Sequence, residues 1–319
     1  MNLQTKIPLS KESDNLIDYE SEILLLGSCF SENIGRKLDY FKFQNLQNPF
    51  GIFFNPKAIE TFVSNAINKK EYTEADIFFR NERWHCFEAH SRLNNPSKEV
   101  LLNTLNERIE ATSNRIWKAS HLIITLGTAW VYRFMETKTV VANCHKVPQN
   151  QFDKELLSIS EITQSLQYLI DLVKFKNANI NIILTVSPVR HLKDGFIENT
   201  QSKAHLIAAI HQLLASQSDS RGVHYFPSYE IMMDELRDYR FYDSDMVHPN
   251  QLAIDYIWER FKEVWISENS LTDMNEVDAI QKGLSHKPFS PNSKAHQAFQ
   301  DNLQAKINSF QVKFPHISF

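Results

Sequence analysis

Two short stretches of the sequence hold residue types that can carry out nucleophilic chemistry. Ser28 and Cys29 follow the apolar run EILLLG, which ends in Gly27, and they stand before a helical pattern. Much later, Asp245 and His248 are three residues apart, ahead of a second helical pattern. An Asp at this spacing can hydrogen-bond one imidazole nitrogen while the other nitrogen faces a nucleophile. The two stretches therefore predict a nucleophile, a base and an orienting carboxylate.

Four short apolar runs, bounded by turn signals, predict the strands that position these residues. Helical patterns lie between the runs, for example at 155–175 and 202–215. The runs lack strict polar alternation, which is typical of strands buried on both faces of a parallel sheet. Ligands of such sheets bind in the crevice at the carboxyl ends of the strands. The four predicted strands are 23–26, 122–126, 180–186 and 223–226.

The chain divides into a main α/β domain, predicted over 1–265, and a helical extension over 266–319. Within the main domain, residues of about 129–145 predict a two-stranded excursion that turns at METKT, at the edge of the sheet. In the extension we expect two helices, with Gly283 as the stop of the first and Pro291 near the start of the second.

Composition and charge argue against several classes of function and location. The formal net charge of -4 argues against nucleic acid as a main partner. No apolar run approaches the roughly 20 residues of a membrane span, and the N-terminal residues lack the apolar core of a secretory signal. Three cysteines in 319 residues fit a reducing compartment. We therefore expect a cytoplasmic protein, and the sequence leaves its oligomeric state open.

The string Gly27-Ser28-Cys29-Phe30, followed by Ser31, resembles the GSCFA-domain family. Together with the late Asp-x-x-His-Pro, a strand that ends in Gly-x-nucleophile resembles the SGNH/GDSL hydrolase superfamily, over about residues 20–265. This resemblance implies a three-layer α/β/α fold with a mostly parallel sheet. It also implies ester hydrolysis or acyl transfer, often on carbohydrate or lipid esters.

The resemblance assigns the nucleophile by position. In the superfamily pattern Gly-Asp-Ser the third residue is the nucleophile, and the third residue here is Cys29, at a helix N-terminus that can lower a thiol pKa. Ser28 is the second choice, if the turn is offset by one residue. The plainer alternative is that Cys29 fills a tight corner as a small apolar side chain. Ser31 is predicted as the N-cap of the helix.

The base would be His248, oriented by Asp245, with Asp243 as an alternative orienting carboxylate. The plainer alternative for this pair is an N-cap carboxylate beside a surface histidine. Arg190 follows the third predicted strand. It either pairs with an anionic substrate group, which a guanidinium recognises bidentately, or is an ordinary solvated arginine.

The sequence matches the superfamily less completely in the residues that would donate hydrogen bonds to an oxyanion. Gly51 corresponds to the glycine whose backbone N–H serves this purpose in the superfamily, or else it is a turn glycine. The superfamily's asparagine, two residues after a later glycine, is missing, because Ala129 stands in that place here. Thr128 or Asn143 would have to substitute. Loss of one oxyanion donor can cost about 10²- to 10³-fold in rate.

The sequence does not predict a zinc site. His85, Cys86 and His90 form one group, and Cys144 and His145 another. These side chains suit zinc, but neither group has a paired ligand spacing, and nothing in the sequence brings the groups together. No phosphate-binding glycine motif occurs either, so no cofactor is expected.

Two functions of different classes remain. The first is an acyl-ester hydrolase or acyltransferase that acts on a small-molecule or glycan ester and carries a Cys or Ser nucleophile. The second is a non-catalytic module that binds a carbohydrate or acyl ligand. The intact Asp-x-x-His favours the first function, and the missing asparagine favours the second.

Overall fold

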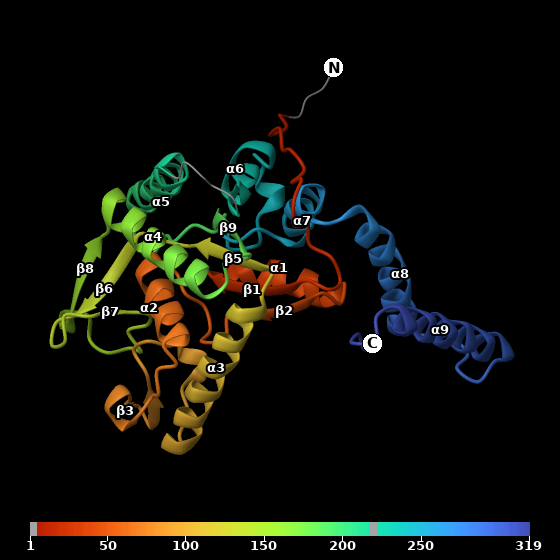
Figure 1. The fold of residues 1–319 in the computed structure, drawn as a ribbon, viewed down its shortest axis with the longest axis horizontal. Coiled ribbons are helices and arrows are strands. Elements are labelled where there is room, and N and C mark those ends of the chain that lie inside the picture. The colour runs from red at the N-terminus through yellow and green to blue at the C-terminus, as the bar shows by residue number, and fades with distance from the viewer. Residues whose placement is uncertain (1–4, 217–221) are drawn as a thin grey trace.

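A five-stranded parallel sheet, in the order β10-β9-β5-β1-β2, forms the centre of the protein in a computed structural model that describes residues 5–216 and 222–319 (Figure 1). All four predicted strands are confirmed. The fifth, β2, was not predicted because its sequence QNLQ is mostly polar and only partly buried. The strands are β1 (Glu22–Gly27), β2 (Gln44–Gln47), β5 (His121–Leu126), β9 (Asn181–Val186) and β10 (Val223–Phe226).

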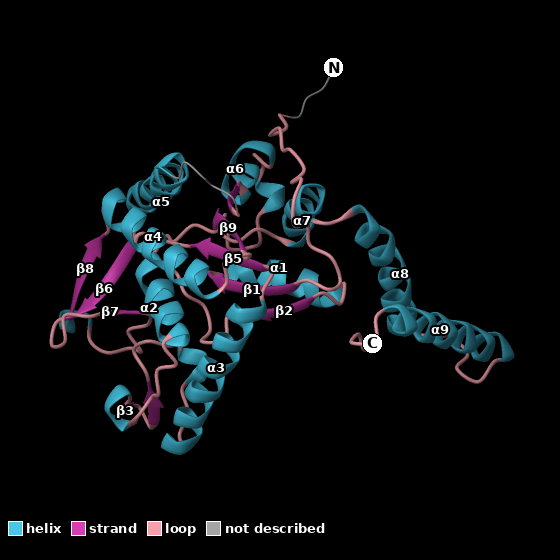
Figure 2. Cartoon of the chain, in the orientation of Figure 1, coloured by secondary structure: helices cyan, strands magenta, loops and turns pink. Residues whose placement is uncertain are grey.

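Helices cover both faces of this sheet, because successive side chains of a strand point to opposite sides. Leu24 and Leu26 pack on the side of α2, α3, α4 and α5, whereas Ile23 and Leu25 pack on the side of α1 and α7. The predicted three-layer α/β/α fold is therefore confirmed (Figure 2). The covering helices are α1 (Cys29–Tyr40), α2 (Pro56–Ile67), α3 (Lys98–Lys118), α4 (Ile159–Lys176), α5 (Phe196–Ser216) and α7 (Gln251–Trp265).

The excursion beside the sheet is larger than predicted. It has three antiparallel strands in the order β7-β6-β8, and its last strand occupies the start of the region predicted as a helix. The helix α4 begins only after Ser158, whose hydroxyl and Glu161 form a capping box. A short hairpin, β3 with β4, lies apart from both sheets. These strands are β3 (Phe78–Arg80), β4 (Arg83–His85), β6 (Trp130–Phe134), β7 (Val140–Val141) and β8 (Phe152–Leu156).

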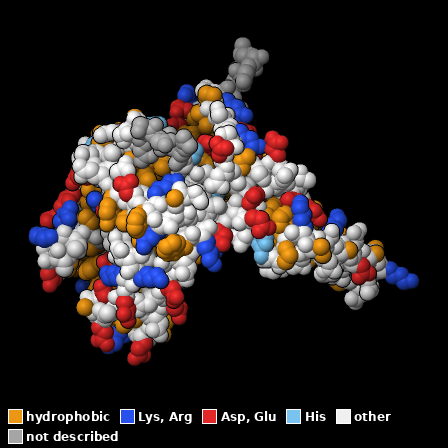
Figure 3. Space-filling model, viewed as in Figure 1, with side chains coloured by type: hydrophobic (Ala, Val, Ile, Leu, Met, Phe, Trp, Pro, Cys, Tyr) orange, Lys and Arg blue, Asp and Glu red, His pale blue; other side chains and the backbone are white. Residues whose placement is uncertain are grey.

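The C-terminal extension consists of α8 (Glu268–Ser285) and α9 (Lys294–Lys313), which project from the body as a narrow arm (Figure 3). Gly283 lies inside the last turn of α8 and does not end it. The chain after α9 returns to the main domain, where the Phe314 ring packs 4.8 Å from the ring of Tyr19. The predicted helical appendage is confirmed, and its end covers the main domain.

Between α5 and α7 the chain forms the short helix α6 (Ser228–Glu230) and a π-helical turn over Ile231–Glu235. Four single turns of 3-10 helix complete the secondary structure of the described ranges. They span Glu74–Asp76, Ser91–Leu93, Gln149–Gln151 and Tyr239–Phe241. No helix within residues 5–216 and 222–319 is both long and apolar enough to cross a membrane.

Gly27 allows the strands β1 and β5 to approach where the chain turns toward α1. Its φ is +128°, and a β-carbon at this position would lie 2.1 Å from the backbone oxygen of Thr125. Ser28 then donates its backbone N–H to the same oxygen at 3.0 Å. Only glycine fits both the backbone conformation and the contact.

We predict that Gly27→Ala lowers the free energy of unfolding by about 1–3 kcal/mol, because both backbone strain and a steric clash result. The measurement is urea denaturation followed by circular dichroism. Gly35→Ala is the matched control: Gly35 lies inside α1, and the atoms near its missing β-carbon belong to the side chain of Gln47, which can move. An equal loss of stability in both variants would contradict the prediction.

Candidate active site

Strand β1 and helix α1 place Ser28 and Cys29 at the carboxyl edge of the sheet. Ser28 is fully buried and caps α1, and its hydroxyl accepts the backbone N–H of Phe30 at 3.3 Å. Cys29 is the first residue of α1 and is partly exposed. The prediction that Ser31 is the N-cap is wrong. Ser31 lies inside the helix and donates its hydroxyl to Leu26 O at 3.0 Å. Of the two predicted nucleophiles, only Cys29 reaches the surface.

The pKa of the Cys29 thiol lies above its ordinary value. Burial is the main cause, and the carboxylate of Glu32 adds to it. The charge of Lys203 and the backbone N–H groups of Cys29 and Phe30 act in the opposite direction, but they do not compensate. The expectation that the helix N-terminus lowers this pKa is therefore wrong in its net direction. The thiol needs a base to become a nucleophile.

Lys203 is a central residue of the site that sequence reasoning missed. It lies on α5, is 1% exposed, and its Nζ donates to Gly127 O and to Ser187 O, both at 2.7 Å. These carbonyls directly follow strands β5 and β9. Burial lowers the pKa of Lys203 to about 7, while the nearby Cys29 raises it. The sequence did contain a signal for the burial of Lys203. It stands three residues before Leu206, on the apolar face of the predicted helix.

Asp245 and His248 form the predicted pair. The Nδ1 atom of His248 lies 2.6 Å from Oδ2 of Asp245, and both side chains are about half exposed, at 49% and 50%. Oδ1 of Asp245 accepts the backbone N–H groups of His248 and Val247, each at 2.9 Å. Hydrogen bonds from these N–H groups, that of His248 first, lower the pKa of Asp245 to about 2. Asp245 thus stays ionised and holds the imidazole by one nitrogen.

Neither of the other interpretations of this stretch fits the geometry. The N-cap of α7 is Asn250, whose side chain accepts the N–H of Ala253, so Asp245 is not a helix cap. Asp243 does not orient the imidazole: its side chain accepts the N–H of Ser244, and its own N–H donates to His248 O. Asp245 is the carboxylate that holds His248.

A second histidine, His191, lies at the same edge and was also missed. Its Nε2 is buried without a hydrogen-bond partner among residues 5–216 and 222–319. This atom would be 3.0 Å from a β-carbon at Gly127, and its ring packs edge-on against Phe54 at 5.1 Å. Burial, followed by the charges of Lys203 and His248, lowers the pKa of His191 to about 3. The imidazole of His191 is therefore neutral.

Charge interactions connect these groups from one end of the site to the other. Lys203 interacts with Cys29, and His191 interacts with both Lys203 and His248. No hydrogen bond joins Cys29 directly to His248 in the described parts of the chain. The electrostatic effects thus run from Cys29 to Lys203, from Lys203 to His191 and from His191 to His248, without a hydrogen bond between the thiol and the imidazole of His248 in the described ranges.

The three predicted oxyanion donors are engaged within the fold. The N–H of Gly51 donates to Asn48 O at 2.7 Å, with φ of +78°, as in a turn. The N–H of Thr128 donates to Phe54 O, and its hydroxyl lies 3.0 Å from that of Ser202. The side chain of Asn143 accepts the N–H of His145. Gly51 is thus the turn glycine of the alternative interpretation.

The two groups of candidate zinc ligands do come together, contrary to expectation. His85 and His145 are buried, and their Nδ1 atoms lie 3.3 Å apart. Cys86 is buried, and His90 uses its Nδ1 to accept the N–H of Arg92. Across residues 5–216 and 222–319, no three His, Cys, Asp or Glu side chains are grouped as metal ligands. Cys144 is partly exposed.

Arg190 is partly buried rather than solvated. Its guanidinium donates to the hydroxyl of Tyr242 and contacts Sδ of Met233, both at 2.8 Å. It borders a cavity of about 470 Å³ that lies beside the loop of His248.

The fold and the site define a class: an α/β/α domain with a nucleophile candidate in the first strand-to-helix turn and a late Asp-x-x-His, which resembles the SGNH hydrolases. The GSCFA family model matches residues 22–261, and the chain belongs to this family. A second model, described as GSCFA domain protein, C-terminal domain, matches residues 277–319. The interval between the two matches, residues 262–276, spans the end of α7 and the first half of α8.

Two solved structures are similar to this chain at 10% sequence identity each. One is a family 3 carbohydrate esterase from Clostridium thermocellum, with a TM-score of 0.35, covering 83% of this chain and 99% of that one. The other is an acetyl xylan esterase from the rumen bacterium Butyrivibrio proteoclasticus, with a TM-score of 0.38, covering 84% of this chain and 66% of that one. No curated protein matches the sequence. Similarity at this level assigns no reaction to this chain.

We predict that Lys203→Met slows the alkylation of Cys29 by iodoacetamide about two- to tenfold, because removal of the positive charge raises the thiol pKa. The difference should be largest below pH 7, where Lys203 is charged, and should shrink at higher pH as Lys203 loses its proton. Peptide mass spectrometry measures the rate.

Cys144 is the internal reference, since its pKa is raised to about 11 by burial alone. Its labelling rate should be the same in both proteins, and circular dichroism checks that the variant folds. A ratio of Cys29 to Cys144 labelling that does not change with the substitution would contradict the role assigned to the Lys203 charge.

Proposed function

We propose that this protein is an acyl-ester hydrolase or acyltransferase in which Cys29 is the nucleophile and His248 the base. The observation that carries the proposal is the Asp245–His248 pair: the carboxylate holds Nδ1 at 2.6 Å, which leaves Nε2 available for proton transfer. The partly exposed Cys29 at the same edge supports it. The substrate class is a carbohydrate ester, a lipid ester or another small-molecule ester.

The reaction would proceed in two steps. The sulfur of Cys29 attacks the acyl carbonyl while Nε2 of His248 accepts the thiol proton, and the intermediate collapses to an acyl thioester as His248 protonates the departing alcohol. Water, or the hydroxyl of an acceptor, then attacks the thioester and gives its proton to His248. His248 returns that proton to the sulfur, which restores the free thiol. The raised pKa of Cys29 makes the base necessary from the first step.

The oxyanion would be stabilised by the backbone N–H of Cys29 and by the side chain of His191. The first turn of α1 leaves the N–H of Cys29 without an intrahelical acceptor. His191 has a buried, unpartnered Nε2 beside Gly127 within the described chain. Its lowered pKa keeps the ring neutral, and a neutral imidazole can donate a hydrogen bond to a developing oxyanion. His191 would then take the place of the missing asparagine.

A second candidate function is a binding module for a carbohydrate or acyl ligand without catalysis. Two observations favour it. The N–H of Gly51 and the polar groups of Thr128 are engaged in internal hydrogen bonds. Cys29 and His248 are not hydrogen-bonded to each other in the described ranges. The kinetic experiment below separates the two functions.

With short-chain ester and thioester probes, we predict that Cys29→Ala lowers turnover by about 10³-fold or more, because the nucleophile is lost. Asp245→Asn should lower kcat by about 10²- to 10⁴-fold, because the imidazole loses its orientation. Steady-state kinetics measure both effects. Mass spectrometry should also find an acyl adduct on the peptide that contains Cys29.

Ser28→Ala is the matched control for Cys29→Ala. This variant should lose about 1 kcal/mol of stability through the missing helix cap and keep its turnover. Loss of turnover in Ser28→Ala alone would move the nucleophile to Ser28. Binding of probe without turnover or adduct in the unsubstituted protein would favour the binding module.

We predict that His191→Phe lowers kcat by about 10- to 10³-fold and changes KM little, because an oxyanion donor acts only in the transition state. His191→Gln should recover part of the loss, since an amide can donate in place of the imidazole. Asn143→Ala is the control and should keep kcat within about threefold, because the structure uses Asn143 to hold the turn at His145. Equal losses in the Phe and Gln variants would contradict the role of His191.

A further inference from the structure

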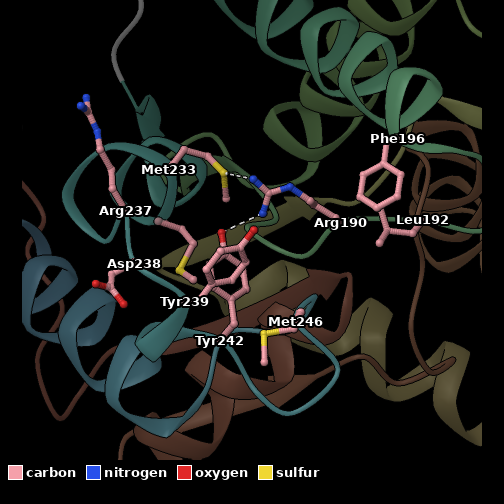
Figure 4. A pocket seen from close by; sticks show the side chains of 10 residues that line it. Arg190, Leu192, Phe196, Met233, Arg237, Asp238, Tyr239, Tyr242 and Met246 are labelled. Atoms are coloured by element: carbon pink, nitrogen blue, oxygen red, sulfur yellow. Dashed lines mark hydrogen bonds between the residues drawn. The ribbon is translucent and has the colours of Figure 1, made fainter.

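A cavity of about 470 Å³ lies between the chain that follows β9 and the segment that leads to His248. Figure 4 shows the guanidinium of Arg190 between Met233 and the ring of Tyr242. Aromatic and thioether side chains form much of the remaining wall, including Tyr239, which is 77% exposed, and Met246, which is 52% exposed. The cavity thus combines one cation with an apolar and aromatic surround.

Arg190 is the one charge of this wall that has no counter-ion in the described chain. Its two contacts are a phenol hydroxyl and a thioether, and no described carboxylate lies within ion-pair distance. The other charges of the wall are balanced: Arg237 pairs with Asp234 at 3.1 Å, and Asp238 pairs with Arg240 at 3.0 Å. A partly buried guanidinium with such weak acceptors leaves a positive charge uncompensated.

Residues of the cavity wall are connected by backbone contacts to the loop that carries His248. Tyr242, which accepts a hydrogen bond from Arg190, forms a β-bridge with Pro249, and the N–H of Asp243 donates to His248 O at 2.8 Å. On the other side, Arg190 precedes His191 in the chain, and the charge of Arg190 reaches Lys203. A group bound at Arg190 would therefore lie next to the proposed reaction centre.

We propose that this cavity binds a carboxylate group of the substrate through Arg190, so that the preferred substrates are esters that carry one negative charge. This inference rests on the proposed function, since it names the substrate class of the same site. One uncompensated positive charge matches a monoanion, whereas a phosphate dianion would exceed the charge of Arg190 and would lie in a cavity that Asp238 also lines. The planar fork of the guanidinium suits a carboxylate.

The test compares two acetate esters of similar size, 4-acetoxybenzoate and 4-acetoxybenzamide, which differ in the charge of the group para to the ester. We expect the unsubstituted protein to prefer the anionic ester by about 10- to 100-fold in kcat/KM, as for a hydrogen bond to a charged group. In Arg190→Gln this ratio should fall close to one. Arg190→Lys should keep part of it, because the charge remains while the fork is lost.

Arg237→Gln is the matched control. Arg237 borders the same cavity, but its charge is already paired with Asp234, so the ratio of the two esters should be retained. A ratio near one in the unsubstituted protein, or an unchanged ratio in Arg190→Gln, would overturn the proposal. Circular dichroism shows that each variant is folded before its ratio is measured.

A binding measurement separates this inference from the proposed function. Calorimetric titration with 4-hydroxybenzoate and 4-hydroxybenzamide requires no catalysis. Tighter binding of the benzoate, lost in Arg190→Gln, would support the anion site even if neither ester were cleaved, and the proposed function alone would then fail. Cleavage of both esters without a preference, together with equal binding of the two phenols, would reject the anion site and leave the proposed function standing.

Discussion

The ammonium group of Lys203 donates to two backbone carbonyls, Gly127 O and Ser187 O, inside the protein where strands β5 and β9 end. A buried ammonium is costly unless its N–H groups are satisfied, and here two carbonyls share that task. The bonds hold together the two strand ends that carry Thr128 on one side and Arg190 with His191 on the other. The position of the second histidine and of the guanidinium therefore depends on one lysine that never reaches the surface.

Burial and neighbouring charges together set the pKa values of the groups in the site. Burial raises the pKa of Cys29 and lowers the pKa values of Lys203 and His191, and in each case it is the largest cause. Asp245 is different, because its side chain is half exposed and accepts backbone N–H groups, and its pKa falls to about 2. The thiol of Cys29 is thus protonated, the imidazole of His191 is neutral, and the carboxylate of Asp245 is ionised.

Much of the fold and part of the site could be predicted from the sequence. The strands β1, β5, β9 and β10 were predictable because strands buried on both faces are continuous apolar runs, whereas the polar β2 gave no such signal. The Asp245–His248 pair was predictable because its partners are three residues apart and interact locally. The positions of Lys203 and His191 were not predictable, because both side chains lie beside Gly127, which is far away in the sequence. Gly127 is 76 positions before Lys203 and 64 positions before His191.

The oxyanion donors show a further limit of sequence reasoning. Gly51 stands at the position that the resemblance assigns, and Thr128 was an expected substitute for the missing asparagine, yet turn formation and side-chain packing use their polar groups. A motif identifies which residues stand at a position, but hydrogen-bond competition within the fold decides which groups remain available. The same competition distinguishes Ser28, whose hydroxyl caps a helix, from Cys29, whose sulfur is partly exposed.

The raised pKa of Cys29 has a consequence for how readily its sulfur is oxidised. Peroxide reacts with the thiolate and not with the thiol, and a sulfenic acid at this position would block the sulfur. Because burial and Glu32 keep the sulfur protonated, the resting protein presents little of the vulnerable form to oxidants. The same desolvation that keeps the thiol protonated thus also limits its oxidation.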